Sequence, residues 1–485
     1  MKRITIKFFI ISSIIIAVVL KIESTNAFNP ISGTDLYTHA RWNSLYDLTE
    51  KDTIDILIMG NSRSYNGINP KQLSCATSSL SFIIGAPGTT FKDTYFSFKE
   101  ILKRTKPKLL VIETYCINNF SYTNSSGTLQ SILKSFSAKI NFKSKLESTP
   151  FLFGVNDWPY AWLTSIRNHN YIFDEKQNLK ENIEKTPQIE ESIKKGSDNK
   201  YVGKYQLYLG KYNGNSGLKK KVIERYKKEG PLTNGATRFV SDTHKEYLKK
   251  LNTLCLENNV ELMFLTIPVY SESIKNHDVF RNYFGKIIKP LNRNWLDLQN
   301  NYDFLPSHFD NVYKAAHHTT ADGSFACTKK LVDFIDNKYQ DLIPSRKSEK
   351  SWLEKFYNTE EYFPYHSAIN NDKKVIKLIE NKNVDGIIVK ECAYTSITQK
   401  YGIIWGKTTI NDSINKNLKN YNLGLIAKVK MDGEVKNIQI IVPYSDIHSN
   451  GKKIVFFTRT KPLEIQQLYR ASFIENKKKS PEESI

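Results

Sequence analysis

Cysteine is scarce in this chain, and acidic residues are scarce relative to basic ones. The 485 residues include only five widely spaced cysteines and no CxxC pair, which argues against a disulfide scaffold or a zinc-ribbon site. With 40% hydrophobic and 25% charged residues, the composition excludes collagen-like, fully disordered and multi-span membrane proteins. At about 150 residues per domain, the chain has room for two or three domains.

The shortage of acidic residues leaves a formal net charge of +21, from 70 Lys and Arg against 49 Asp and Glu. Such an excess favours nucleic acid, anionic lipid headgroups or an anionic polymer as a partner. The basic residues are mostly Lys and are scattered among Asn, Ser and Ile. A solvated surface accounts for most of them, so the charge by itself does not define a nucleic-acid site.

Long apolar runs are absent, apart from one near the N-terminus. Basic residues within 1–7 precede 13 uncharged residues at 8–20. At about 1.5 Å per residue this run reaches roughly 20 Å, short of a bilayer core of about 30 Å. That length suits a signal peptide cleaved after the small residues at 25–27. An uncleaved membrane anchor, with Lys7 and Lys21 reaching the headgroups, and a buried apolar helix are the alternatives.

Either membrane-targeting interpretation exports the rest of the chain, because the positive flank stays in the cytoplasm. The expected location is the cell envelope, at the periplasmic or extracytoplasmic face of the cytoplasmic membrane. An exported protein meets envelope polymers, so no nucleic-acid partner is expected.

Short apolar runs alternate with helical patterns between residues 50 and 342, which predicts an α/β domain. Strands are expected at 53–60, 79–85, 107–115 and 260–270, and helices at 94–106, 237–259 and 323–339. This rhythm predicts a parallel sheet with right-handed crossovers. Residues 120–235, rich in Ser, Asn and Lys, are expected to form an insertion or cap. The aromatic residues at 151–163 within it are expected to be core rather than a platform for sugars.

After about residue 345 the pattern changes to short apolar runs bounded by Asn, Asp and Gly. These runs predict a smaller β-rich domain over residues 350–475. The final residues 476–485 are expected to form a disordered tail. The sequence therefore predicts a targeting segment at 1–27, an α/β domain at 50–342 and a β-rich C-terminal domain.

A serine directly after the first predicted strand is the most informative feature. Ser62 lies in the stretch ILIMGNSRSYNGINP at 56–70. The carboxyl ends of strands are where an α/β sheet presents reactive groups, but a serine hydroxyl needs a base to remove its proton. A histidine held by a carboxylate would serve, and HFDNVYKAAHHTTADG at 308–323 supplies both residue types near the end of the same domain.

Together these stretches resemble the SGNH, or GDSL-like, superfamily of esterases and acyltransferases, as ordered blocks over roughly residues 52–340. Ser62 and the Gly-Asn before it are similar to the block that carries the nucleophile. Gly88 in GAPGTT matches the oxyanion glycine, and His318 lies five residues before Gly323 as in the last block. The resemblance implies a flavodoxin-like, three-layer α/β fold and an exported or membrane-anchored enzyme that acts on cell-envelope polymers.

Two positions depart from the pattern of the family. Asn61 stands where the family usually has Asp, and Ala315 stands three residues before the base, where an acid is expected. Asp310 is therefore our candidate for the acid, with the residues that follow it as a local insertion. His317 is a second candidate for the base, although it is one residue farther from the following glycine than His318.

The resemblance implies a two-step acyl transfer without a metal or another cofactor. Ser62 would attack an ester carbonyl while His318 takes its proton and Asp310 orients the imidazole. The backbone N–H groups of Ser62 and Gly88, with the amide of Asn118 or of the next asparagine, would bind the oxyanion. The predicted function is an esterase or O-acyltransferase that modifies a cell-surface polysaccharide or a related anionic polymer. An acyl donor or a membrane acyl-transfer partner would supply the acyl group.

Simpler interpretations stand beside this one. Ser62 could be a turn or helix-cap residue, Gly88 could serve a tight turn, and the pair His317–His318 could be structural. The chain would then be a non-catalytic envelope protein that keeps the fold and binds glycan or an assembly partner. A phosphate-handling enzyme fits less well, because the expected metal-binding carboxylates are missing. A hydrogen bond between Ser62 and His318 would favour the enzyme.

Overall fold

The computed structural model divides the chain into two compact units. Unit 1 comprises residues 1–71, 79–328 and 340–344, and unit 2 comprises residues 72–78, 329–339 and 345–485. The structure describes residues 2–25, 27–29, 33–77, 79–117, 126–172, 179–180, 183–184, 218, 220–231, 233–235, 239–299, 304, 306–309, 318–343, 375–384, 387–396, 402–410, 421–442, 447–450, 453–460 and 464–475.

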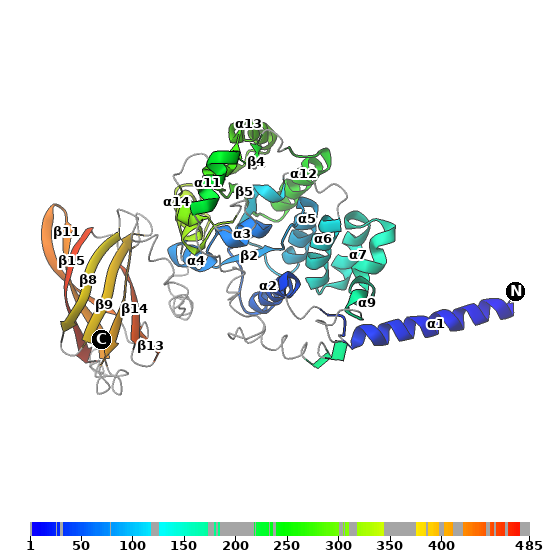
Figure 1. The fold of residues 1–485 in the computed structure, drawn as a ribbon, viewed down its shortest axis with the longest axis horizontal. Coiled ribbons are helices and arrows are strands. Elements are labelled where there is room, and N and C mark those ends of the chain that lie inside the picture. The colour runs from blue at the N-terminus through cyan, green and yellow to red at the C-terminus, as the bar shows by residue number, and fades with distance from the viewer. Residues whose placement is uncertain are drawn as a thin grey trace. The chain divides into compact units, whose positions relative to one another are not determined.

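A five-stranded parallel sheet forms the centre of unit 1 (Figure 1). In spatial order its strands are β2 (Ser81–Gly85), β1 (Ile56–Gly60), β3 (Leu109–Glu113), β5 (Glu261–Thr266) and β7 (Asn294–Asp297). The predicted α/β class and parallel sheet are therefore confirmed. The sequence analysis missed β7, because four residues that begin with Asn and end with Asp make too short an apolar run to recognise.

Helices cover both faces of this sheet. One face shares an apolar core with α2 (Gly33–Lys51), α5 (Phe91–Leu102), α12 (Asp242–Glu257) and α13 (His277–Ile288). Leu57 and Met59 of β1 point into this core, whereas the alternating Ile56 and Ile58 lie outside it and are fully buried. The second face is therefore covered as well. The short helix α3 (Ser62–Gly67) contacts β1 and β2, and a Cβ at Gly67 would clash with Ile267, which follows β5.

Local capping explains where the predicted helices begin. Thr90 caps α5, so this helix starts three residues before the predicted residue 94. Ser241 caps α12, which starts at residue 242 rather than 237. The last predicted helix is α14 (Ala321–Lys338). Further elements of the chain are α4 (Pro70–Thr77) and the paired short strands β4 (Thr233–Asn234) and β6 (Ile274–Lys275).

The predicted insertion after β3 is largely helical where it is described. Its helices are α6 (Ser126–Ala138), α7 (Phe142–Leu152), α8 (Trp158–Trp162), α9 (Thr164–Arg167) and α11 (Lys220–Glu229). The prediction that the aromatic residues at 151–163 belong to the core is only partly confirmed. Trp162 packs against the buried Phe136, but Trp158 and Tyr160 are each 39% exposed.

Unit 2 contains two antiparallel sheets, which agree with the predicted β-rich C-terminal region. One sheet has the order β13 (Ile447–Asn450), β14 (Lys453–Thr460), β10 (Gly402–Ile410), β9 (Ile387–Ser396) and β8 (Val375–Val384), and the other β12 (Glu434–Val442), β11 (Tyr421–Met431) and β15 (Glu464–Glu475). On β11, Leu423, Leu425, Ala427 and Val429 are buried at every second position. The predicted tail at 476–485 lies outside the described residues.

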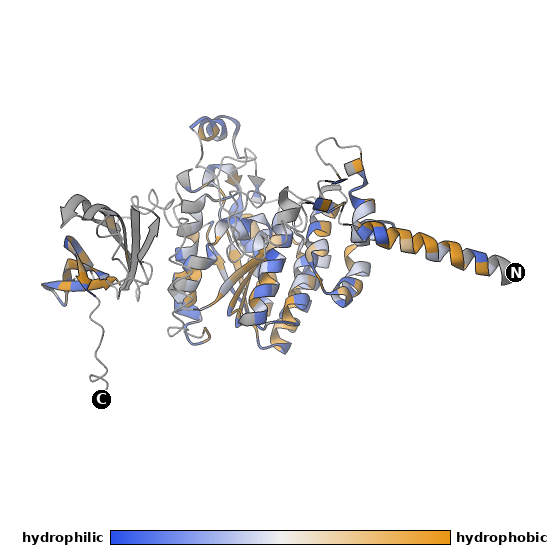
Figure 2. Cartoon of the chain, turned by 90° about the horizontal axis from the view of Figure 1, so that it is seen from below, coloured by the Kyte–Doolittle hydropathy of each residue, from blue (hydrophilic) through white to orange (hydrophobic). Residues whose placement is uncertain are grey.

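The N-terminal helix α1 (Lys2–Ser24) is more extended than the uncharged run suggested. Its segment Thr5–Ser24 has 20 residues and is long and apolar enough to cross a membrane, by length and composition. At 1.5 Å per residue it reaches about 30 Å, the thickness of a bilayer core. None of this apolar segment is buried in the structure (0%), and it forms the orange helix of Figure 2. Such a helix fits a signal peptide or a membrane anchor.

Candidate functional site

Ser62 is the first residue of α3, directly beyond the carboxyl end of β1. The side chain of Asn61 caps the helix, because its Oδ1 accepts a hydrogen bond from the Arg63 N–H at 3.0 Å. The Asn66 side chain donates to the Ser62 carbonyl at 2.7 Å. The helix cap is therefore Asn61, and the interpretation of Ser62 as a cap is wrong. Every residue of α3 after Ser62 is buried, which holds the serine on a fixed support.

His318 lies in the loop that leads into α14. The hydroxyl of the next residue, Thr319, donates to the Asn66 carbonyl of α3 at 2.7 Å. Thr319 also pairs with Phe309 in an antiparallel bridge. Because Thr319 is buried and tied to α3, it fixes the backbone of His318 beside the helix that starts with Ser62.

A glycine explains how this loop enters α14. The Thr320 N–H donates to the His308 carbonyl at 2.9 Å, and the Thr320 hydroxyl accepts from the Gly323 N–H at 3.2 Å, as a helix cap does. A Cβ at Gly323 would lie 2.0 Å from the His308 carbonyl oxygen, so a side chain does not fit there. The spacing from His318 to Gly323 thus has a steric cause.

The structure brings Ser62 and His318 together. The Nε2 atom of His318 lies 2.8 Å from the Oγ atom of Ser62, although 256 residues separate them in sequence. Both residues are half-buried. With Nε2 unprotonated, the imidazole accepts the serine hydroxyl hydrogen, which is the relation between a nucleophile and its base.

Glycines let the ends of the first two strands approach each other. A Cβ at Gly85 would lie 2.3 Å from the Gly60 carbonyl oxygen, and a Cβ at Gly60 would lie 2.8 Å from the Cβ of Glu113. Gly88 follows in a tight turn: its φ is +69°, and the Thr89 N–H donates to the Ala86 carbonyl at 3.1 Å. Glycine favours that left-handed position of a type II turn. Gly88 therefore serves a tight turn. No hydrogen bond among the described residues joins Gly88 to Ser62 or His318.

Two arginines near the serine were not expected inside the protein. Arg63 is 2% exposed, and its guanidinium carbon lies 3.6 Å from the centre of the Tyr115 ring. Arg41 is 1% exposed, stacks on the Tyr65 ring at 3.8 Å and donates to the Gly85 carbonyl at 3.1 Å. The sequence offered a signal only for Arg63 and the two tyrosines, which come within five residues after the ends of β1 and β3.

Several predicted site residues fall outside the described part of the chain. These are Asp310, His317, Asn118 and Asn119. Their roles stay predictions. One observation bears on the choice of Asp310. Phe309, the residue before it, forms an antiparallel bridge with Thr319, the residue after His318.

Other groups at this edge of the sheet do not suggest a different chemistry. The Sγ of Cys116 is buried and donates to the Glu113 carbonyl at 3.0 Å. Burial and the nearby Glu113 raise the pKa of the Cys116 thiol well above its usual range, so it is a poor nucleophile. Within the described residues, no three His, Cys, Asp or Glu side chains gather in a way that could hold a metal ion.

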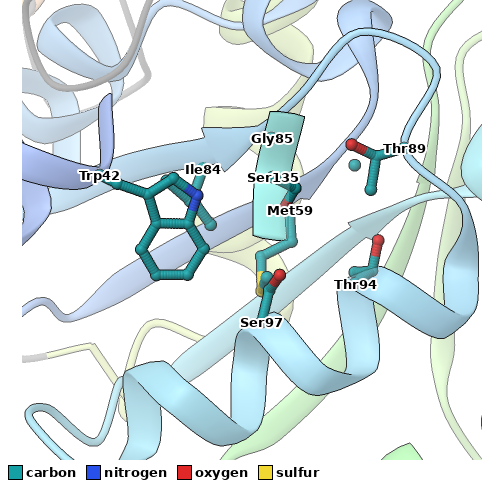
Figure 3. Close-up of a pocket in the computed structure, with 9 residues that line it drawn as sticks. Trp42, Met59, Ile84, Gly85, Thr89, Thr94, Ser97 and Ser135 are labelled. Carbon is teal, nitrogen blue, oxygen red and sulfur yellow. The ribbon is translucent and has the colours of Figure 1, made fainter. Parts of the chain in front are cut away.

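A small cavity lies between the sheet and the helices beside the site (Figure 3). Trp42, Met59 and Ile84 line it on one side, while Thr94 and Ser97 of α5 line it on another. Its volume of about 10 Å³ suits a single water molecule. It is therefore too small for a substrate.

No protein-family model and no curated protein matches this chain. The function must therefore come from the geometry. In open α/β sheets, ligands bind outside the carboxyl ends of the strands, where the strand order reverses. The sheet reverses between β1 and β3, and the Ser62–His318 pair follows β1 at that position. This arrangement can activate a serine hydroxyl for attack on a carbonyl group.

Proposed function

We propose that this chain is an exported, SGNH-type serine esterase or O-acyltransferase that modifies a cell-surface polysaccharide or a related envelope polymer. The observation that carries the proposal is the 2.8 Å contact between the Ser62 hydroxyl and His318 Nε2. If Ser62 were only a turn residue and His318 only structural, neither role would require contact between two residues 256 positions apart in sequence.

The topology supports the same conclusion. Numbered along the chain, the five parallel strands lie in the order 2-1-3-4-5, which is the flavodoxin-like order. The serine follows the first strand, and the histidine precedes the helix that comes after the last strand. This is the placement that the resemblance to the SGNH superfamily implies for its nucleophile and base.

The reaction would proceed in two steps. His318 takes the hydroxyl proton as Ser62 Oγ attacks an ester carbonyl, and collapse of the tetrahedral intermediate releases the donor alcohol, which receives that proton. Water or a sugar hydroxyl then attacks the acyl-serine and loses its proton to His318, and Ser62 leaves as a hydroxyl again. Water makes the protein an esterase, and a sugar hydroxyl makes it an O-acyltransferase.

Asp310 remains our candidate for the acid that orients His318. The choice rests on the sequence and on the described neighbours of these two residues, since Phe309 and Thr319 form an antiparallel bridge. The Ser62 N–H, at the first position of α3, is our candidate for one oxyanion donor, and Gly88 and Asn118 are candidates for the others. Loss of one such donor typically costs about 3 kcal/mol of barrier.

The test uses the purified full chain and a fluorophosphonate probe, which labels an activated serine. We expect the wild type to react, Ser62→Ala to give no labelling, and His318→Ala to react about 10³-fold more slowly because the base is lost. The matched control is His169→Ala, an exposed histidine in another part of unit 1. It should label like the wild type.

Thermal unfolding of each variant shows whether it is folded. A folded wild type that does not react, or equal labelling of the wild type and Ser62→Ala, would contradict the proposal and favour a non-catalytic envelope protein. Release of acid from an acetyl ester, measured with and without added polysaccharide, then distinguishes an esterase from a transferase.

A further inference from the structure

The C-terminal end of α1 is joined to another helix of unit 1 by hydrogen bonds. Glu23, near the end of α1, accepts four hydrogen bonds from the first two residues of α9. The Thr164 N–H and hydroxyl donate to its Oε2 at 2.9 and 2.5 Å. The Ser165 N–H donates to its Oε1 at 2.9 Å, and the Ser165 hydroxyl donates to the same oxygen. A carboxylate at this place satisfies backbone N–H groups that the first turn of a helix leaves open.

The residues after α1 continue these contacts. Ala27 and Phe28 are 7% and 9% exposed, and the Asn168 side chain donates to the Phe28 carbonyl at 2.8 Å. Cleavage after residue 27 would remove Glu23 and leave the start of α9 without its acceptor. These contacts favour a retained anchor over a cleaved signal peptide.

The surface next to this contact is unusually apolar. Of sixteen exposed large apolar side chains that the described residues show outside α1, nine lie within residues 140–172. Val155 is 72% exposed, and Trp158, Tyr160 and Ile166 are 39%, 39% and 37% exposed. We call these four residues the α8 surface. Helix α8 contacts α9, and α9 contacts α1, beside which it lies in Figure 1. The α8 surface is therefore near the end of the candidate membrane span.

The chemistry of this surface fits a bilayer interface. Trp and Tyr prefer the boundary between headgroups and acyl chains, and basic residues near it attract anionic lipids. Besides the buried Lys139, residues 134–169 carry four Lys and Arg but only two acidic residues. A span of about 30 Å that ends at residue 24 puts Glu23, and with it the start of α9, at the depth of the headgroups.

We propose that α1 is retained as a membrane anchor and that the α8 surface rests on the same bilayer. Glu23 couples the two, because it joins the end of the span to the helix next to the surface. Unit 1 would then be held in one orientation against the membrane rather than tethered by a loose linker. This proposal does not depend on the catalytic role of Ser62.

The experiment uses the full chain in vesicles of phosphatidylcholine and phosphatidylglycerol in equal amounts. Val155→Cys carries an environment-sensitive fluorophore, and some lipids carry a nitroxide quencher near the headgroup. The matched control is Val279→Cys on α13, a valine that is 50% exposed. Cys75→Ser is added to all variants, so that the remaining cysteines are the buried Cys116, Cys255, Cys327 and Cys392.

We expect several-fold stronger quenching at position 155 than at position 279, and the intact mass should include residues before Ala27. Glu23→Ala should lower the quenching at position 155 while the protein stays in the vesicles, because the anchor remains and the coupling is lost. Equal quenching at both positions would overturn the proposal and leave the α8 surface for a protein partner. A mass that begins after residue 27 would also overturn it. Fluorophosphonate labelling is measured in parallel, so a failure here is distinguishable from a failure of the proposed function.

Discussion

The α/β core of unit 1 and the β-sheets of unit 2 bury different kinds of side chain. In unit 1, Arg41, Arg63, Asp93 and Lys139 are each at most 2% exposed. Between residues 375 and 475, every side chain that the structure describes as buried is apolar, the thiol of Cys392 included. One region keeps charges inside, and the other has an apolar interior.

This difference indicates where the chemistry lies. A buried charge costs several kcal/mol unless it is well paired, so proteins tend to keep such groups where they serve a purpose. Arg63 directly follows Ser62, and Arg41 binds the carbonyl at the end of the neighbouring strand β2. Two of the buried cations of unit 1 therefore lie beside the strand ends that carry the candidate site, while the side chains described as buried between residues 375 and 475 are apolar.

The largest expected effect on stability concerns the buried ion pair of unit 1. Lys139 Nζ lies 3.0 Å from Asp93 Oδ1, and their side chains are 1% and 0% exposed. Lys139→Ala should destabilise unit 1 by about 3–5 kcal/mol, because it leaves the Asp93 carboxylate buried without its partner. Chemical denaturation monitored by circular dichroism measures this loss. The control is Lys250→Ala, which breaks an exposed pair with Glu246 on α12 and should cost less than about 1 kcal/mol. Similar losses in both variants would show that burial does not make the Lys139–Asp93 pair more costly to break than an exposed pair.

The second prediction concerns the apolar core of unit 2. Leu425 on β11 is 0% exposed and pairs with Ile440 and Ala471. Leu425→Ala should cost about 2–5 kcal/mol, since it leaves a cavity, and it should not change fluorophosphonate labelling of Ser62. Met431→Ala, on the same strand but 37% exposed, is the control and should have an effect near zero. Loss of labelling in a folded Leu425→Ala protein would show that the two regions are not separate in function.

The smallest expected effect is a dependence on pH in unit 1. Burial and the nearby cations Arg167 and Lys145 lower the pKa of His39 to about 3, although the residue as a whole is only half-buried. Below a pH of about 6.5 the unfolded chain binds a proton that the folded protein does not, so stability falls as the pH falls. His39 should therefore lower the free energy of unfolding by up to about 2 kcal/mol between pH 7 and pH 5. His39→Gln should remove this part of the slope, and His169→Gln should not. A slope unchanged in His39→Gln would assign the pH dependence to other groups.

Regular patterns in the sequence predicted much of the fold. Four strands of the parallel sheet and helices α5, α12 and α14 follow from apolar periodicity, because buried strands and amphipathic helices need apolar residues at fixed spacings. β7 and α13 were missed. β7 is too short to produce a pattern, and its place as the fifth strand depends on pairing with β5.

The candidate site was predictable only in part. Ser62 follows a strand and His318 precedes a helix, so both could be chosen from the sequence as residues at the carboxyl edge of the sheet. The burial of Arg63 against Tyr115 could not be foreseen, because the two lie on different segments and meet only when β1 and β3 pair. The clash that excludes a side chain at Gly323 likewise depends on a carbonyl fifteen residues away.

The sequence by itself determined the coarse organisation of the protein: a parallel α/β unit, a β-rich C-terminal region, an apolar N-terminal segment, and a serine and a histidine near the two ends of the α/β unit. These features depend on local preferences, which each short segment carries alone. The tertiary structure decided that Ser62 Oγ and His318 Nε2 meet at 2.8 Å and that Glu23 binds the start of α9. Such contacts join residues more than a hundred positions apart, and only the packing of the whole unit brings them within hydrogen-bond distance.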